Sequence, residues 1–160
     1  MNEARAPLLV FGWGNPSRGD DALGPLFVER LQRDCGDDPR IAWLTDFQPQ
    51  VEHALDLAGR ARVLLVDASV VADAPFAVTQ PRPHRDASFG THAISPSALL
   101  QAYVDLHGGA APPPTTLLAI RGASFELGEP LGDEARRHLG AALEWGRRWL
   151  RGVAAPEDAA

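Results

Sequence analysis

The segment formed by residues 8–25 constrains the fold of this chain more than any other, and it reads LLVFGWGNPSRGDDALGP. Its first four residues are a continuous apolar run, which is typical of a strand buried on both faces of a parallel sheet. The run breaks into a turn with two glycines, and a helical spacing of apolar residues follows. Strand, tight turn and helix in this order indicate an α/β sheet, whose sites lie at the carboxyl ends of its strands.

Strand and helix patterns alternate along the rest of the chain. Apolar runs predict five strands, at residues 8–12, 41–46, 62–67, 76–79 and 115–120. Helical spacing predicts four helices, at residues 22–34, 51–58, 95–106 and 133–151. We therefore expect an α/β fold, a three-layer α/β/α sandwich with a mostly parallel twisted sheet of about five strands. The strand at 76–79 is flanked by prolines and is expected near an edge.

Length and composition narrow the class of protein. The 160 residues, 45% of them apolar, predict a single domain over residues 1–160. The net charge of −6 argues against a nucleic-acid partner, and no apolar stretch is long enough for a membrane span. One cysteine, Cys35, allows no internal disulfide, and residues 1–5 do not have the pattern of a signal peptide. We expect a cytoplasmic monomer.

Three side chains are candidates for a site at the carboxyl edge of the sheet. Asp21 follows the first strand, Asp67 closes the third, and His92 precedes the helix that begins near Ser95. Two carboxylates and one imidazole suit a borderline divalent metal with open positions for water or a substrate atom. The predicted topology places the three side chains at one edge of the sheet. Their spacing in the sequence alone does not establish this.

Each candidate also has a structural interpretation. Asp20 and Asp21 open a helix, where acids are favoured as caps and by the helix dipole. Asp67 is harder to explain in this way, because a carboxylate at the end of a buried strand is costly to desolvate without a partner. On this interpretation the chain is a binding module or a nucleotide-binding α/β domain whose acids only cap helices.

Other familiar chemistries do not fit the motifs present. The dinucleotide pattern G-x-G-x-x-G fails, since Ser17 stands at the third glycine, Pro16 lacks an N–H, and the acids would repel a pyrophosphate. The chain has neither the zinc motif H-E-x-x-H nor the nucleophile motif G-x-S-x-G. Acids near Cys35 are expected to raise the pKa of its thiol rather than activate it.

The sequence resembles the [NiFe]-hydrogenase maturation endopeptidases. The resemblance rests on Gly12-x-Gly14-Asn15 leading into Asp20-Asp21-x-x-Gly24, on Leu65-Val66-Asp67-Ala68, and on Thr91-His92 before a helix. These motifs span most of the chain in the family's order. The segments 46–48, 52–57 and 121–128 resemble the branch that serves bidirectional, NAD-reducing hydrogenases.

The resemblance implies a protease that removes a C-terminal extension from the precursor of the hydrogenase large subunit after nickel insertion. By position, Asp21, Asp67 and His92 match the residues of the family that contact metal; some members carry Glu where this chain has Asp21. The twisted sheet between helices that the family has agrees with the fold predicted above.

This set of residues suggests how such a protease works. We expect no tightly bound cofactor in the isolated chain, because nickel held by the precursor would complete the shell of two Asp and one His. Either the metal polarises the scissile carbonyl or a carboxylate such as Asp21 activates water. Supporting or turn-shaping roles are expected for Gly12, Gly14, Asn15, Asp20 and Asp46. The cleavage site and the hydrogenase served are left open.

Overall fold

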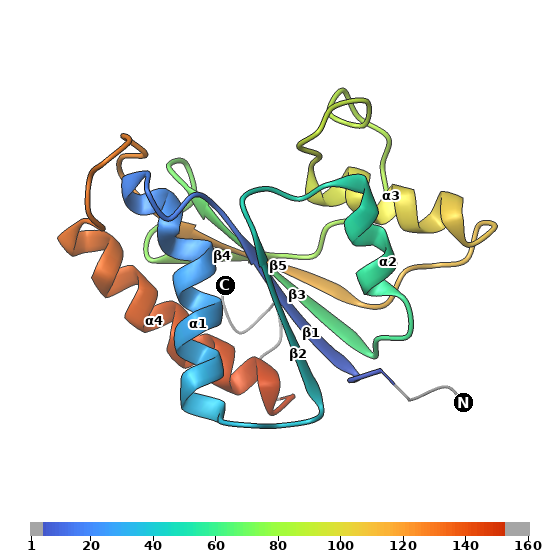
Figure 1. The fold of residues 1–160 in the computed structure, drawn as a ribbon, viewed down its shortest axis with the longest axis horizontal. Coiled ribbons are helices and arrows are strands. Elements are labelled where there is room, and N and C mark those ends of the chain that lie inside the picture. The colour runs from blue at the N-terminus through green and yellow to red at the C-terminus, as the bar shows by residue number, and fades with distance from the viewer. Residues whose placement is uncertain (1–4, 153–160) are drawn as a thin grey trace.

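Five strands form one twisted sheet in the order β2-β1-β3-β5-β4 (Figure 1). The computed structural model describes residues 5–152, so the first four residues, where no signal-peptide pattern was found, lie outside the described part. Four strands run parallel, and their bounds are Leu8–Trp13 (β1), Ile41–Asp46 (β2), Arg62–Ser69 (β3) and Thr115–Arg121 (β5). The fifth strand, Phe76–Thr79 (β4), pairs antiparallel with β5 at the edge, as the prolines around it predicted.

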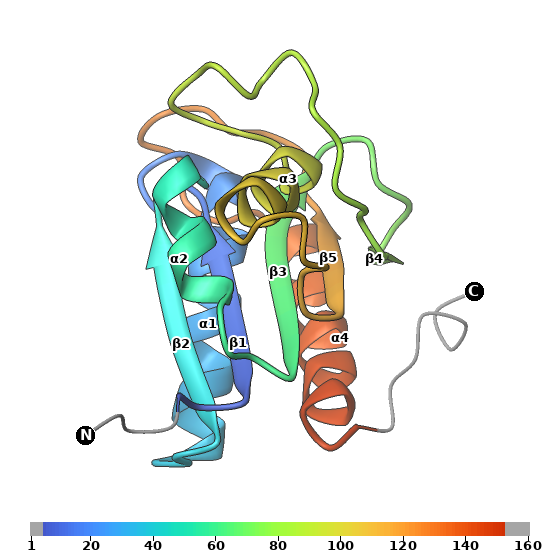
Figure 2. The same ribbon diagram turned by 90° about the vertical axis from the view of Figure 1, so that its right-hand side faces the viewer.

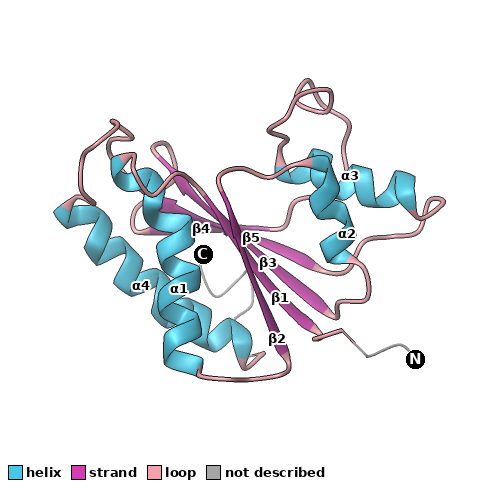
Figure 3. Ribbon diagram, viewed as in Figure 1, coloured by secondary structure: helices cyan, strands magenta, loops and turns pink. Residues whose placement is uncertain are grey.

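Helices cover both faces of the sheet, which confirms the predicted sandwich (Figure 3). The long helices Leu23–Cys35 (α1) and Asp133–Leu150 (α4) lie on one face, while Ala54–Leu57 (α2) and Pro96–Leu106 (α3) lie on the other. Two short 3-10 turns, Gly19–Ala22 (η1) and Val51–His53 (η2), precede α1 and α2. Among the described residues, no helix is both long enough and apolar enough to cross a membrane.

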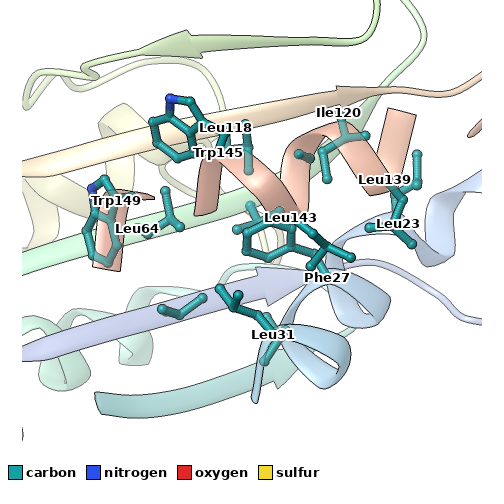
Figure 4. Packing of buried hydrophobic residues seen from close by; sticks show 14 of the residues in the cluster. Leu23, Phe27, Leu31, Leu64, Leu118, Ile120, Leu139, Leu143, Trp145 and Trp149 are labelled. Atoms are coloured by element: carbon teal, nitrogen blue, oxygen red, sulfur yellow. The ribbon is translucent and has the colours of Figure 1, made fainter. Parts of the chain in front are cut away.

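The larger core fills the space between the sheet and the pair α1 and α4 (Figure 4). Phe27 of α1 and Leu139 of α4 are fully buried there against Leu118 and Ile120 of β5. Trp145 and Trp149 of α4 also belong to this core, and they are 5% and 3% exposed. The second core joins the other face of the sheet to α2 and α3. Both faces of the sheet are therefore apolar, and the polar groups gather at its ends.

Two boundaries differ from the prediction in a way that matters for the site. The helix expected at residues 22–34 is preceded by the 3-10 turn η1, so Asp20 and Asp21 lie in that turn. The strand expected to end at Asp67 continues to Ser69, because residues 68 and 69 still pair with β5. Asp67 is therefore held within the sheet rather than in a loop beyond it.

Candidate functional site

The carboxyl ends of β1, β2 and β3 meet at the top of the sheet in Figure 2, and the predicted acids lie at or directly after these strand ends. Asp21 lies on η1 directly after β1, and Asp67 lies near the end of β3. In the parallel register Gly12 is opposite Val66, so Trp13 and Asp67 are neighbours on adjacent strands. Topology thus brings these residues to one edge of the sheet, as expected for α/β proteins.

Glycines let the turn after β1 pack directly on the helix that follows. A Cβ atom on Gly12 would lie 2.4 Å from the carbonyl oxygen of Gly24, and one on Gly24 would lie 2.2 Å from that of Trp13. Gly14 has a φ of +148°, and a Cβ there would lie 1.9 Å from the Asp21 carbonyl oxygen. Since no side chain fits in these gaps, the glycines fix the close approach that positions Asp21.

The Asp21 carboxylate faces back across this turn instead of capping a helix. Its Oδ2 accepts a hydrogen bond of 2.8 Å from the backbone N–H of Asn15. Neither η1 nor α1 has a side-chain cap at its N-terminus. Asp21 therefore does not cap a helix, which was the structural alternative for this residue.

Asp67 is the most perturbed acid of this edge. Burial raises the pKa of its carboxyl from 3.8 to about 7, and the nearby charge of Asp21 adds to the increase. Hydrogen bonds from the Ala68 backbone and the Trp13 side chain offset only part of this effect. Two carboxyl groups that lie close together in a half-buried position repel each other and do not stabilise the fold. Such pairs are typical of functional sites.

Asp20 differs sharply from its neighbour, although the sequence presents the two as a pair. Its side chain is only 4% exposed and accepts three backbone hydrogen bonds from the loop between β5 and α4. The donors are the N–H groups of Ala123 at 2.7 Å, Gly132 at 2.8 Å and Ser124 at 3.4 Å. Asp20 therefore ties η1 to this loop and contributes to the fold.

Asp46, the last residue of β2, is held in place by a buried histidine. Its Oδ1 accepts the Phe47 N–H at 2.7 Å, and its Oδ2 lies 3.1 Å from Nε2 of His53. Because Nδ1 of His53 accepts the Gln50 N–H at 2.8 Å, Nε2 carries the proton and donates to Asp46. No motif in the sequence predicts this pair, whose two residues lie seven positions apart.

His92 lies on an exposed loop that is anchored at the same edge. The N–H of Ile94, which is 4% exposed, bonds to the Pro49 carbonyl at 3.1 Å, beside the segment that follows β2. At the other side of the loop, the Asp86 carboxylate accepts hydrogen bonds from the hydroxyls of Ser88 and Ser95. These contacts hold the loop, while the His92 side chain itself is exposed to solvent.

The structure brings Asp21 and Asp67 together but does not join His92 to them as a set. Within residues 5–152, no group of three or more His, Cys, Asp or Glu side chains is arranged to hold a metal ion. The shared metal position of Asp21, Asp67 and His92 thus stays a prediction. Cys35 lies away from this edge, near the end of α1, where burial and the charges of Asp34 and Asp38 raise the pKa of its thiol.

Solved structures of other proteins share this fold. No family model and no curated relative matches the sequence. Among solved structures, the HycI [NiFe] hydrogenase maturation protease of Thermococcus kodakarensis KOD1 superimposes with a TM-score of 0.71 at 21% identity, covering 91% of this chain and 93% of that one. The hydrogenase maturating endopeptidase HybD of E. coli gives a TM-score of 0.70 at 25% identity, covering 91% and 92%.

A third structure, the solution structure of an endopeptidase from Escherichia coli, gives a TM-score of 0.67 at 25% identity and covers 92% of this chain and 94% of that one. The described residues thus have the fold of [NiFe] hydrogenase maturation proteases such as HycI and HybD.

Proposed function

We propose that this chain is an endopeptidase that removes the C-terminal extension of a nickel-loaded [NiFe]-hydrogenase large-subunit precursor. The observation that carries the proposal is the pair Asp21 and Asp67, held at the carboxyl edge of a sheet whose fold is that of the maturation proteases. Burial of Asp67 beside a second carboxyl works against folding, and a ligand cation would relieve that unfavourable situation. The pair is therefore better explained by a cationic substrate than by stability.

In this proposal nickel is part of the substrate. Nickel already bound by the precursor is contacted by Asp21, Asp67 and His92, so that cleavage waits for a loaded precursor. The exposed position of His92 on its loop leaves the imidazole accessible to a docking protein. Asp46, oriented by His53, supports the same edge from β2.

The chemical step is hydrolysis of one peptide bond. The oxygen of a water molecule bonds to the scissile carbonyl carbon, and the bond from that carbon to nitrogen breaks. One water proton goes to the departing nitrogen, and a carboxylate, either Asp21 or Asp67, accepts the other. The products are a new carboxylate on the mature subunit and a released peptide with a free amine.

The precursor of an NAD-reducing hydrogenase is the substrate that the sequence favours. Two of the three segments behind this prediction, residues 46–48 and 52–57, lie in and after the end of β2, and the third, residues 121–128, begins at the last residue of β5. All three therefore begin at the edge that carries the acids. Exchange of residues 121–128 for those of a relative serving another hydrogenase would test this choice.

The proposed activity predicts a specific mass change. Incubation of the chain with a nickel-loaded large-subunit precursor is expected to remove one C-terminal peptide, which intact-mass spectrometry detects directly. Asp73→Asn, a change of an exposed aspartate in the loop after β3, serves as the control and should process normally. An unchanged precursor mass after incubation with wild-type chain would refute the proposed function.

A further inference from the structure

The edge strand β2 presents unpaired backbone groups over part of its length, since the outward N–H of Ile41 already bonds to the Asp38 carbonyl at 3.1 Å. Within residues 5–152, β2 pairs with β1 only, and it forms the outer boundary of the sheet in Figure 2. The other edge strand, β4, has only four residues and prolines at positions 75 and 81 that limit further pairing. β2 has six residues and no proline. The two edges are thus protected to different degrees.

The unpaired backbone groups of β2 can be assigned from its bonds to β1. Leu8 donates to the carbonyl of Arg40, and Gly14 donates to that of Asp46, so the even-numbered residues face β1. Backbone groups alternate in direction along a strand, and those of Trp43 and Thr45 therefore face away from the sheet. They offer two N–H donors and two carbonyl acceptors to a chain lying alongside.

The surroundings of this edge suit an extended peptide that leads toward the acids. A groove of about 300 Å³ adjoins the start of β2 and includes Trp43, and one of about 260 Å³ adjoins its end. The second groove is lined by Gly14, Thr45 and Phe47, and the Phe47 side chain is 68% exposed. Gly14 belongs to the turn that positions Asp21, so this groove reaches the candidate site.

Charge indicates which kind of segment fits. The carboxylate of Asp46 is 42% exposed at the end of the edge, and Asp37 is exposed near its start. Asp38, the other acid at the start, is already paired with Arg40 at 2.8 Å. A segment that carries neutral or cationic side chains is therefore favoured over an acidic one.

We propose that an extended segment of the precursor adds to the free edge of β2 as a sixth strand, with the Trp43 and Thr45 backbone as its hydrogen-bonding partners. This inference rests on the proposed function and names where the substrate of that function binds. Main-chain pairing supplies affinity for the segment. The groove lined by Phe47 and the carboxylate of Asp46 supply selectivity for the side chains of the segment. The segment is thereby delivered to the end of β2, next to Asp21.

Hydrogen exchange of the wild-type chain tests the inference without any substitution. Addition of nickel-free precursor, which remains uncleaved under the proposed function, is expected to slow exchange of the Trp43 and Thr45 amides at least about tenfold. The Val78 amide of β4, which faces away from β5, serves as the control and should not change. Unchanged exchange at Trp43 and Thr45 with precursor bound would overturn the inference.

A proline on the open edge tests the same contact kinetically. Thr45→Pro removes an outward N–H that the pairing with β1 does not use, and it is expected to raise KM for loaded precursor about tenfold with little change in kcat. Val78→Pro places the same residue on the opposite edge and should leave KM unchanged.

The outcomes distinguish a failure of the proposed function from a failure of the inference about β2. No cleavage of loaded precursor by the wild-type chain would refute the proposed function, whatever the exchange data show. Normal cleavage with an unchanged KM in a folded Thr45→Pro variant would overturn only the β2 inference. Protection of Trp43 and Thr45 that grows with protein concentration in the absence of precursor would assign the edge to a second copy of this chain, which also overturns it.

Discussion

Asp67→Asn is expected to abolish processing of the precursor while making the folded chain more stable at pH 8. Burial raises the pKa of Asp67 to about 7, so at pH 8 the wild-type chain must keep an ionised carboxylate in an unfavourable position. The rise of this pKa from 3.8 to about 7 corresponds to a free-energy cost on the order of 4 kcal/mol at pH 8. The neutral amide of asparagine removes that cost and also removes the charge needed to contact a cation or accept a proton.

The pH dependence follows from the direction of the shift. Between about pH 4 and pH 7 the folded state holds a proton on Asp67 that the unfolded state has already lost. The contribution of this group to stability is therefore fully present below about pH 4 and is lost progressively as pH rises from there through about 7. The unfolding free energies of wild type and Asp67→Asn should converge near pH 4 and separate at pH 8.

Urea unfolding at both pH values measures this difference. Asp73→Asn makes the same change of charge at an exposed site and should show no such separation. A variant Asp67→Asn that is less stable than wild type at pH 8, or that still processes precursor, would show that Asp67 serves the fold.

Asp20→Ala, in contrast to Asp67→Asn, is expected to make the folded chain less stable, by on the order of 3 to 5 kcal/mol. The substitution leaves the N–H groups of Ala123, Ser124 and Gly132 without the carboxylate that accepts them. Removing one partner from a buried, charge-assisted network is among the more destabilising single changes. Thermal unfolding should show this loss directly.

Asp21→Ala is the matched comparison, since it makes the same substitution at the next residue. It removes one hydrogen bond, from the Asn15 N–H, and is expected to lower stability by only about 1 kcal/mol. Processing should nevertheless be lost at a temperature where the variant is folded. Equal stability losses in the two variants would contradict the division of roles between these adjacent acids.

The sequence predicted the fold well because each element has a strong local pattern. The continuous apolar runs of β1 and β3 arise from burial on both faces of a parallel sheet, and these runs are visible without any tertiary information. The position of β4 at an edge followed from its flanking prolines. The 3-10 turn before α1 was not predicted, since the same polar residues are compatible with a first helical turn.

The roles of the acids could be predicted only in part. Asp20 and Asp21 are indistinguishable in sequence, because the partners of Asp20 lie 103 to 112 residues further along the chain. The effect of Trp13 on Asp67 depends on the register between β1 and β3, which no local pattern reveals. The His53 to Asp46 contact likewise depends on how η2 folds back toward the end of β2.

A competition in one reaction tests the central claim most directly. The chain is incubated with equal amounts of nickel-loaded precursor and nickel-free precursor labelled with 15N, and intact-mass spectrometry follows both. The account predicts that the loaded precursor loses its C-terminal peptide while the labelled, nickel-free precursor keeps its full mass. Equal cleavage of the two precursors, or cleavage of neither, would contradict it.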